Sequence, residues 1–189
     1  MAADTRTRMM EATVQALQRH GVAGMSFTEV LADSGAARGA IYHHFPGGKT
    51  QLVAEAAARN GDDVNAHLAA LPAADPQEVV QAFLAAVRPV LAASATGGGC
   101  AVAAVTVGEP GEPSARAVAS AVFQSWIQTL TDRLTAAGLE PDQAHGLAVT
   151  LITLLEGAHV LCRAAGTLKP YDQTAGTITA LLRACLNHR

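Results

Sequence analysis

The sequence predicts an all-α protein in which an N-terminal three-helix module precedes a larger helical domain, with about nine helices in all. Alanine, leucine and valine dominate the 189 residues, whereas aromatic residues make up 4% and charged residues 15%. Long alanine and leucine stretches with few β-branched runs favour helix. Apolar residues also recur three and four positions apart between breaks that contain glycine or proline, as in amphipathic helices.

The first helix has one apolar face. Met10, Val14 and Leu17 follow one another at i, i+4 and i+7, which brings them to the same side of a helix. Gly21 comes shortly after them. We therefore expect a helix of about four turns that ends before Gly21.

The second helix begins at a capping box. In Ser26-Phe27-Thr28-Glu29 the serine hydroxyl can accept a hydrogen bond from the amide of Glu29, and the glutamate can reach back to the serine amide. Gly35 follows two turns later and can adopt the positive φ of a tight turn. A short helix is expected between them.

A third short helix is expected from Ala37 to Phe45, before the break at Pro46-Gly47-Gly48. Ile41 and Phe45 are four residues apart, so they face inward together and leave the polar side chains of the segment outside. Gly39 would cost about 1 kcal/mol relative to alanine inside such a helix. That cost suggests that its backbone closely approaches another molecule.

The rest of the chain is read as further helices. A helical stretch runs from Lys49 to about Leu71, and Asp75-Pro76-Gln77-Glu78 starts the next helix with an aspartate cap and a first-turn proline. The remaining expected elements are a short helix over Ala101–Val107, a loop over Gly108–Pro113, and long helices at about Ser114–Ala137, Asp142–Ala165 and Asp172–Leu186.

The last two helices are apolar over much of their circumference. Their wide stripes contain Leu147, Leu151, Leu154, Leu155, Ala158 and Leu161, and then Ile178, Leu181, Leu182 and Cys185. A helix of this kind must be covered on two sides. We expect one cover to be the domain itself and the other a second copy, which makes a homodimer with a four-helix interface.

Composition narrows the functional classes. No stretch of about 18 apolar residues is uninterrupted and the N-terminal segment is polar, so we expect a soluble, cytoplasmic protein. The three cysteines, Cys100, Cys162 and Cys185, lack metal-site spacing, and we expect neither a structural metal nor a cofactor. The net charge is −3, but residues 1–50 carry five Lys or Arg against four acidic residues, a weak sign of an anion-binding module.

Three short helices in a row, the last two joined by a glycine-containing turn, are typical of a helix-turn-helix. Such a module lays its third helix in the major groove of DNA, which is wide enough to admit an α-helix. The pattern therefore predicts a partner, double-stranded DNA.

The detailed sequence carries a family resemblance. The segment from Ser26 to Lys49, above all Ala-Ile-Tyr-His-His-Phe followed by a turn and a lysine, resembles the DNA-binding signature of the TetR family. Residues 45–49, 99–104 and 155–158 resemble its LmrA/YxaF-like branch. This resemblance implies a DNA-binding domain over 1–50 and an effector-binding and dimerisation domain over 51–189.

The resemblance also implies roles for individual residues. Those expected at phosphates are Thr28, Tyr42 and Lys49; those expected at base edges are Arg38, Gly39, Ala40 and His43; His44 would support or touch the backbone. Arg38 is the candidate for a bidentate contact to guanine. No second basic residue lies beside it, which leaves the base preference open.

An effector cavity is the second implication. The residues on the helices that enclose it in the resembling family are Phe83, Val87, Phe123, Trp126, Ile127, Leu130, Leu155, Glu156 and His159. Such pockets are mainly apolar with few polar groups. Each of these side chains taken alone is better explained as ordinary core, since a helix stripe needs no ligand, so only the set as a whole favours a site.

Other chemistry fits poorly. Gly48-Lys49-Thr50 resembles the end of a phosphate-binding loop, but the glycine required five residues earlier is His43. Glu156 with His159, and Asp142 with His145, have the spacing of di-iron ligands, yet the pairs lie about 21 Å apart on one helix. No catalytic triad order is present, so we expect no enzyme.

The sequence thus predicts a ligand-responsive DNA-binding regulator, a repressor released from a palindromic operator by a small, largely apolar or aromatic effector. The alternative is a helical enzyme or small-molecule carrier that retains an unused helix-turn-helix-like N-terminus.

Overall fold

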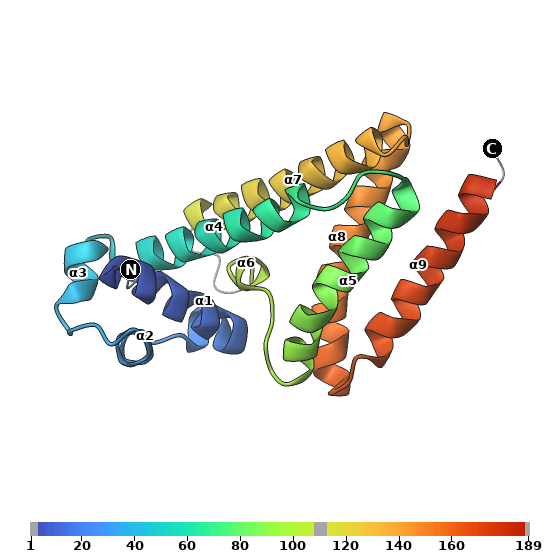
Figure 1. The fold of residues 1–189 in the computed structure, drawn as a ribbon. Helices are drawn as coiled ribbons and strands as arrows, with labels where there is room; N and C mark the ends of the chain where they lie inside the picture. The colour runs from blue at the N-terminus through green and yellow to red at the C-terminus, as the bar shows by residue number, and fades with distance from the viewer. Residues whose placement is uncertain (1–3, 108–112, 188–189) are drawn as a thin grey trace. The chain divides into compact units, whose positions relative to one another are not determined.

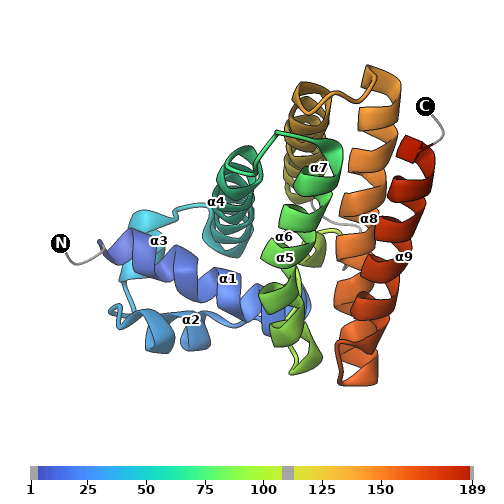
Figure 2. The same cartoon turned by 45° about the vertical axis from the view of Figure 1, so that its right-hand side comes forward.

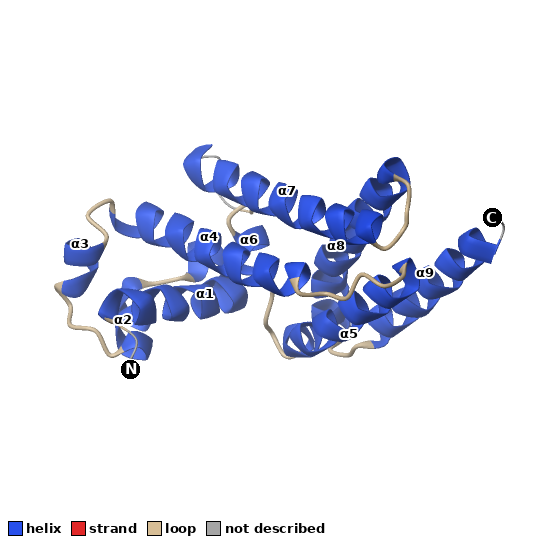
Figure 3. Ribbon diagram, turned by 45° about the horizontal axis from the view of Figure 1, so that its top comes forward, coloured by secondary structure: helices blue, strands red, loops and turns tan. Residues whose placement is uncertain are grey.

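The regular structure of the described residues is helical, as predicted. The computed structural model describes residues 4–107 and 113–187, and these residues form helices without any strand (Figure 3). The helices are α1 Thr5–Gly24, α2 Phe27–Ser34, α3 Ala40–His44, α4 Gly48–Ala69, α5 Pro76–Ala95, α6 Ala101–Ala104, α7 Pro113–Ala136, α8 Pro141–Ala165 and α9 Lys169–Asn187 (Figure 1). Most of the expected loop over Gly108–Pro113 lies outside the described residues.

The chain packs into two compact units. The first unit comprises residues 1–63 and 100–122, and the second comprises residues 64–99 and 123–189. Packing does not divide the chain after residue 50, because α4 continues unbroken to Ala69 and α6 packs against α1. Where the DNA-reading function ends along the chain remains a prediction.

Helix α1 is capped at its start and kinked near its end. The Asp4 carboxylate accepts a hydrogen bond from the amide of Thr7 at 2.7 Å. Gly21 has φ 66° and ψ −176°, a conformation that favours glycine, and the helix resumes to Gly24. The regular helix therefore breaks where the sequence predicted its end, although one more short turn follows.

Helix α2 has half of the expected capping box. Ser26 Oγ accepts from the amide of Glu29 at 3.2 Å. The Glu29 carboxylate lies 3.2 Å from Nε2 of His20, so it ties α2 to α1 instead of closing the box. Gly35, at φ 64°, ends the helix as expected.

The first unit has a continuous apolar core. Its fully or almost fully buried members include Met9, Leu17, Val30, Ile41, Phe45, Leu52 and Ala101. At the far end of this unit α4 approaches α7 closely, since a Cβ added to Gly61 would lie 2.5 Å from Cγ1 of Val122. That separation is too short for any side chain, so Gly61 allows the two helices to meet.

The second unit is built on α5, α8 and α9, which pack against one another (Figures 1 and 2). Asp75 caps α5 by accepting from the amide of Glu78 at 2.9 Å, as predicted. The Tyr171 hydroxyl donates to the carbonyl of Leu84, and Arg88 Nη2 lies 3.3 Å from Asp172 Oδ1. These contacts join α9 to α5.

Helices α5 and α8 are long and apolar enough to cross a membrane by length and composition alone. The same test is passed by core helices of soluble proteins, and both helices bury much of their apolar surface within this unit. Of the stripes predicted on α8 and α9, Leu151, Leu155 and Ile178 are buried in the chain. Leu161 and Leu181 remain 55% and 60% exposed.

Candidate functional site

The helix that the sequence assigned to base reading is shorter than predicted. Helix α3 spans Ala40–His44 rather than Ala37–Phe45, because Arg38 and Gly39 form a turn and Phe45 leaves the helical conformation at φ −135° and ψ 74°. Gly39 is the N-cap with φ −74°, and a Cβ there would meet open space. The expected cost of a glycine inside the helix therefore does not apply, and no close packing within the chain requires a glycine at this position.

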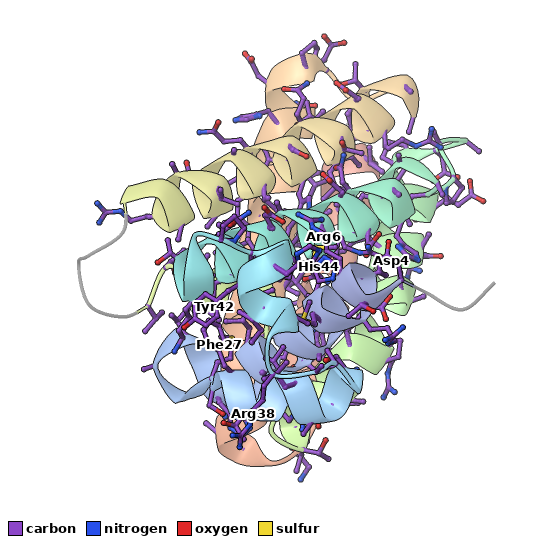
Figure 4. All side chains as sticks on the ribbon, turned by 90° about the vertical axis from the view of Figure 1, so that its left-hand side faces the viewer. Asp4, Arg6, Phe27, Arg38, Tyr42 and His44 are labelled. Atoms are coloured by element: carbon purple, nitrogen blue, oxygen red, sulfur yellow. The ribbon has the colours of Figure 1, made fainter. Side chains whose placement is uncertain are left out.

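The two faces of α3 differ sharply. Ile41 and Phe45 are 1% and 0% exposed, so both face inward as predicted. Tyr42 is 67% exposed, and His43 and Arg38 are also exposed. Figure 4 looks onto this side of the first unit and labels Tyr42 and Arg38. The apolar side anchors the helix and leaves its polar side open to a partner.

A series of side-chain contacts from α1 and α4 holds the end of α3 in place. The Arg6 guanidinium lies 5.0 Å from the centre of the Phe45 ring, a cation–π contact, and pairs with Glu55. Glu55 accepts from Gln51 Nε2 at 2.8 Å, and Gln51 Oε1 accepts from the Gly47 amide at 2.8 Å. The turn between α3 and α4 is thus fixed from within.

Lys49 has an internal partner that the sequence did not reveal. Its ammonium donates to the carbonyl of Met25 at 2.8 Å, which ties the first turn of α4 to the loop before α2. The side chain is half-buried. Since an ammonium has three protons to donate, the expected phosphate contact is compatible with this tether.

His44 faces the start of α1. The amide of Thr7 holds the pKa of the Asp4 carboxyl below its ordinary value, and the charge of His44 adds to this lowering. The rings of His43 and His44 are 4.9 Å apart and inclined at 75°. Figure 4 places His44 beside Asp4 and Arg6, so its position suits a supporting role behind the exposed side of α3.

All eight residues expected at DNA lie in the first unit. The exposed ones are Thr28, Arg38, Gly39, Tyr42 and His43, and the half-buried ones are Ala40, His44 and Lys49. The residues that hold these expected DNA contacts in place were not predicted from the sequence. Arg8 Nε donates to the carbonyl of Ser34 at 2.9 Å, and the Phe27 ring contacts Tyr42 edge to face. These contacts join residues distant in sequence, so no local pattern predicts them.

The nine residues expected around an effector all lie in the second unit, on α5, α7 and α8. Six are buried, namely Phe83, Val87, Trp126, Leu130, Leu155 and His159, and Phe123, Ile127 and Glu156 are half-buried. Phe123 and Trp126 pack edge to face with ring centres 5.3 Å apart. The set is therefore apolar and aromatic, with polar atoms at few points.

His159 provides one of these polar points. Its Nδ1 lies 2.6 Å from Oγ of Ser94 on α5, and both side chains are buried. Burial lowers the pKa of His159 to about 4, so the ring is neutral at pH 7. A neutral imidazole in an apolar surrounding is able to hydrogen-bond without carrying charge.

We expect acid to destabilise the protein through His159. Its pKa is lower in the folded chain than the ordinary 6.5, so the unfolded chain binds more protons between about pH 6.5 and 4 and stability falls as pH falls. From pH 7 to 5 the free energy of unfolding should drop by about 2 kcal/mol through this group. Urea unfolding at both pH values, at one protein concentration, measures the change.

The control separates His159 from the other histidines. His159→Gln should lose most of that pH dependence, whereas His145→Gln, which removes an exposed histidine of the same helix, should keep the wild-type dependence. Equal pH dependence in the wild type and His159→Gln would contradict the assignment.

Metal ligands do not gather in the parts of the chain that the structure describes. Among residues 4–107 and 113–187, no three His, Cys, Asp or Glu side chains come together in a way that could hold a metal ion. The candidate sites in this part of the chain are an exposed helix face and an apolar cluster.

Two family models match the chain, one in its N-terminal part and one in its C-terminal part. Residues 9–56 match the family model for bacterial regulatory proteins of the tetR family, and residues 76–177 match the C-terminal domain of LmrA/YxaF-like transcriptional regulators. The chain is 36% identical to an uncharacterized HTH-type transcriptional regulator of Mycobacterium tuberculosis, with 97% of each chain covered. It is 27% identical to the HTH-type transcriptional regulator LmrA of Bacillus subtilis, covering 95% of this chain and 97% of that one.

Solved structures share the fold. A TetR transcriptional regulator from Legionella pneumophila superposes with a TM-score of 0.83 at 20% identity, over 96% of this chain and 98% of that one. A TetR-family regulator from Agrobacterium tumefaciens gives a TM-score of 0.79 at 21% identity, over 93% and 96%. These likenesses bear on the fold.

Proposed function

The chain belongs to the TetR family, in its LmrA/YxaF-like branch, and from this premise we propose that it is a repressor that a small apolar or aromatic effector releases from a palindromic operator. Members of this family are soluble DNA-binding transcriptional regulators, so the chain is a DNA-binding regulator and not an enzyme. The enzyme alternative is therefore removed. We propose that it acts in the cytoplasm.

One observation carries the DNA-reading part of the proposal. Ile41 of α3 and Phe45 directly after it are 1% and 0% exposed, whereas Tyr42 of the same helix is 67% exposed. A tyrosine exposed in this way offers both its ring and a hydroxyl to a partner outside the chain. In the proposed complex this exposed side enters the major groove, with Arg38 and His43 at base edges.

Phosphate contacts would set the position of that helix on the duplex. We assign them to the hydroxyls of Tyr42 and Thr28 and to the ammonium of Lys49 in the first turn of α4. Helix N-termini favour anions because free amides and the helix dipole point toward them. Such contacts orient the protein but carry no sequence information.

A homodimer through α8 and α9 would present two such helices to two half-sites. On α8, Val160 and Leu161 are 67% and 55% exposed, and on α9 Leu181 is 60% exposed. A Cβ at Gly157 of α8 would meet open space within the protomer, so this helix surface admits a close neighbour. Two copies meeting here would form an isologous four-helix interface.

The second unit would receive the effector. The buried aromatic and aliphatic side chains around Trp126 favour an apolar ligand, and neutral His159 with Ser94 would supply a hydrogen-bonding group. Binding would stabilise a spacing of the two recognition helices that differs from the roughly 34 Å between successive major grooves. The effector thereby shifts the population of dimers toward this second spacing, and the affinity for the operator falls.

Trp126 allows effector binding and release of the DNA to be measured in one experiment. It is the chain's single tryptophan and is 2% exposed, so its fluorescence reports directly on the proposed site. Planar aromatic compounds are titrated into the protein bound to a labelled duplex from DNA flanking its own gene. We expect one compound class to change Trp126 emission and to release the duplex over the same concentration range.

Two results would contradict the proposal. If no duplex binds, the DNA-reading part fails. If ligands change the emission but never the DNA affinity, or if they bind a Phe83→Ala variant as tightly as the wild type, the effector part fails.

A further inference from the structure

The exposed tyrosine of α3 is held by a residue of another helix. The rings of Phe27 and Tyr42 are 6.2 Å apart, centre to centre, and inclined at 85°. This is an edge-to-face pair, for which separations of about 4.5–7 Å are typical. Figure 4 has the two side chains next to each other, Phe27 from the first turn of α2 and Tyr42 from α3.

Phe27 stands on a well-anchored segment. It is half-buried and packs against the core of the first unit. The two residues before it are held by hydrogen bonds, because the Met25 carbonyl accepts from the Lys49 ammonium at 2.8 Å and Ser26 Oγ accepts from the Glu29 amide at 3.2 Å. The ring that contacts Tyr42 therefore has a defined position.

Tyr42 has little other support. It lies in a helix of five residues, and 67% of its surface is exposed. An exposed side chain samples several rotamers and must lose that freedom when its hydroxyl binds a partner. A ring contact that already selects one orientation removes part of this loss.

We infer that Phe27 is a positioning residue for DNA binding, which acts by holding the Tyr42 ring so that its hydroxyl meets a backbone phosphate. This inference rests on the proposed function. The tether between Lys49 and Met25 extends it, because Met25 and Phe27, two residues apart, each contact a residue assigned to a phosphate.

A double-mutant cycle tests the inference. Affinity is measured by fluorescence anisotropy, at low salt, for a labelled random-sequence duplex of about 30 base pairs, because phosphate contacts need no operator. Tyr42→Phe removes only the hydroxyl and should weaken binding about tenfold. Phe27→Leu keeps an apolar side chain in the core and should weaken binding about threefold to fivefold.

The affinity of the double variant Phe27→Leu/Tyr42→Phe for the duplex decides between the two outcomes. If Phe27 acts through the Tyr42 hydroxyl, Phe27→Leu should cost almost nothing in the Tyr42→Phe background, so the double variant binds about as Tyr42→Phe does. Phe27→Tyr, which keeps the ring, should bind like the wild type. Circular dichroism and the thermal midpoint verify folding, and Phe27→Met replaces Phe27→Leu if the latter does not fold.

A matched control addresses general loss of stability. Val22→Ala shortens a half-buried side chain that packs against the same core. Its fold-loss in affinity for the duplex should multiply with the fold-loss caused by Tyr42→Phe. If the Phe27→Leu and Tyr42→Phe losses also multiply, or if Phe27→Leu binds like the wild type, the positioning role is wrong while the DNA interface stands. A wild-type protein that binds no duplex overturns the proposed function and this inference with it.

Discussion

The combined substitution Arg38→Ala with Tyr42→Phe is expected to lower affinity for the operator at least about a hundredfold. A bidentate arginine–guanine pair contributes about 1–3 kcal/mol of discrimination, and a hydrogen bond to a charged group about 1.5–3 kcal/mol. Arg38 is exposed and Tyr42 is 67% exposed, so neither substitution should disturb the core. Anisotropy titrations with the operator measure the loss.

The single variants should differ in kind. Arg38→Ala should relax preference at one base pair of each half-site, whereas Tyr42→Phe should weaken binding to all sequences alike. Arg116→Ala, which removes an exposed arginine of α7 outside the helix-turn-helix, is the control and should bind normally. Equal operator affinity in the wild type and the double variant would remove α3 from the interface.

A charge on the exposed face of α8 should dissociate the dimer. Leu161 is 55% exposed in the protomer, but in the proposed dimer it is covered by the partner. Leu161→Glu would then bury a carboxylate without a partner, which costs several kcal/mol. We expect a monomer in sedimentation velocity and a loss of at least about a hundredfold in operator affinity, because a monomer engages one half-site only.

Val90→Glu is the matched control for this prediction. Val90 is an aliphatic residue, 46% exposed, on α5, and its substitution should leave both the dimer and operator binding intact. If Leu161→Glu sediments as the wild-type dimer does, the interface lies elsewhere.

Local signals in the sequence predicted much of the fold. The serine at position 26, the Asp75-Pro76 pair and Gly35 each act within one helical turn, so the residues that decide the helix ends are adjacent in sequence. The predicted inward orientation of Ile41 and Phe45 is also confirmed, because apolar spacing in a short helix leaves one arrangement that buries both.

Other features depend on partners far along the chain. Glu29 pairs with His20 rather than closing its capping box, and Lys49 donates to Met25. Helix α3 begins at Ala40 because Arg38 and Gly39 form a turn, a choice that short-range propensity does not determine in so brief a helix. The roles proposed for the site residues stay predictions, since they concern partners outside the chain.

DNase I footprinting of the wild-type protein on DNA flanking its own gene is the most direct measurement of operator reading by α3. We expect a protected palindromic segment with half-site centres about one helical turn apart. Protection should disappear with Arg38→Ala/Tyr42→Phe at the same protein concentration. Uniform weak protection of every fragment, unchanged by that double variant, would mean that α3 does not read an operator.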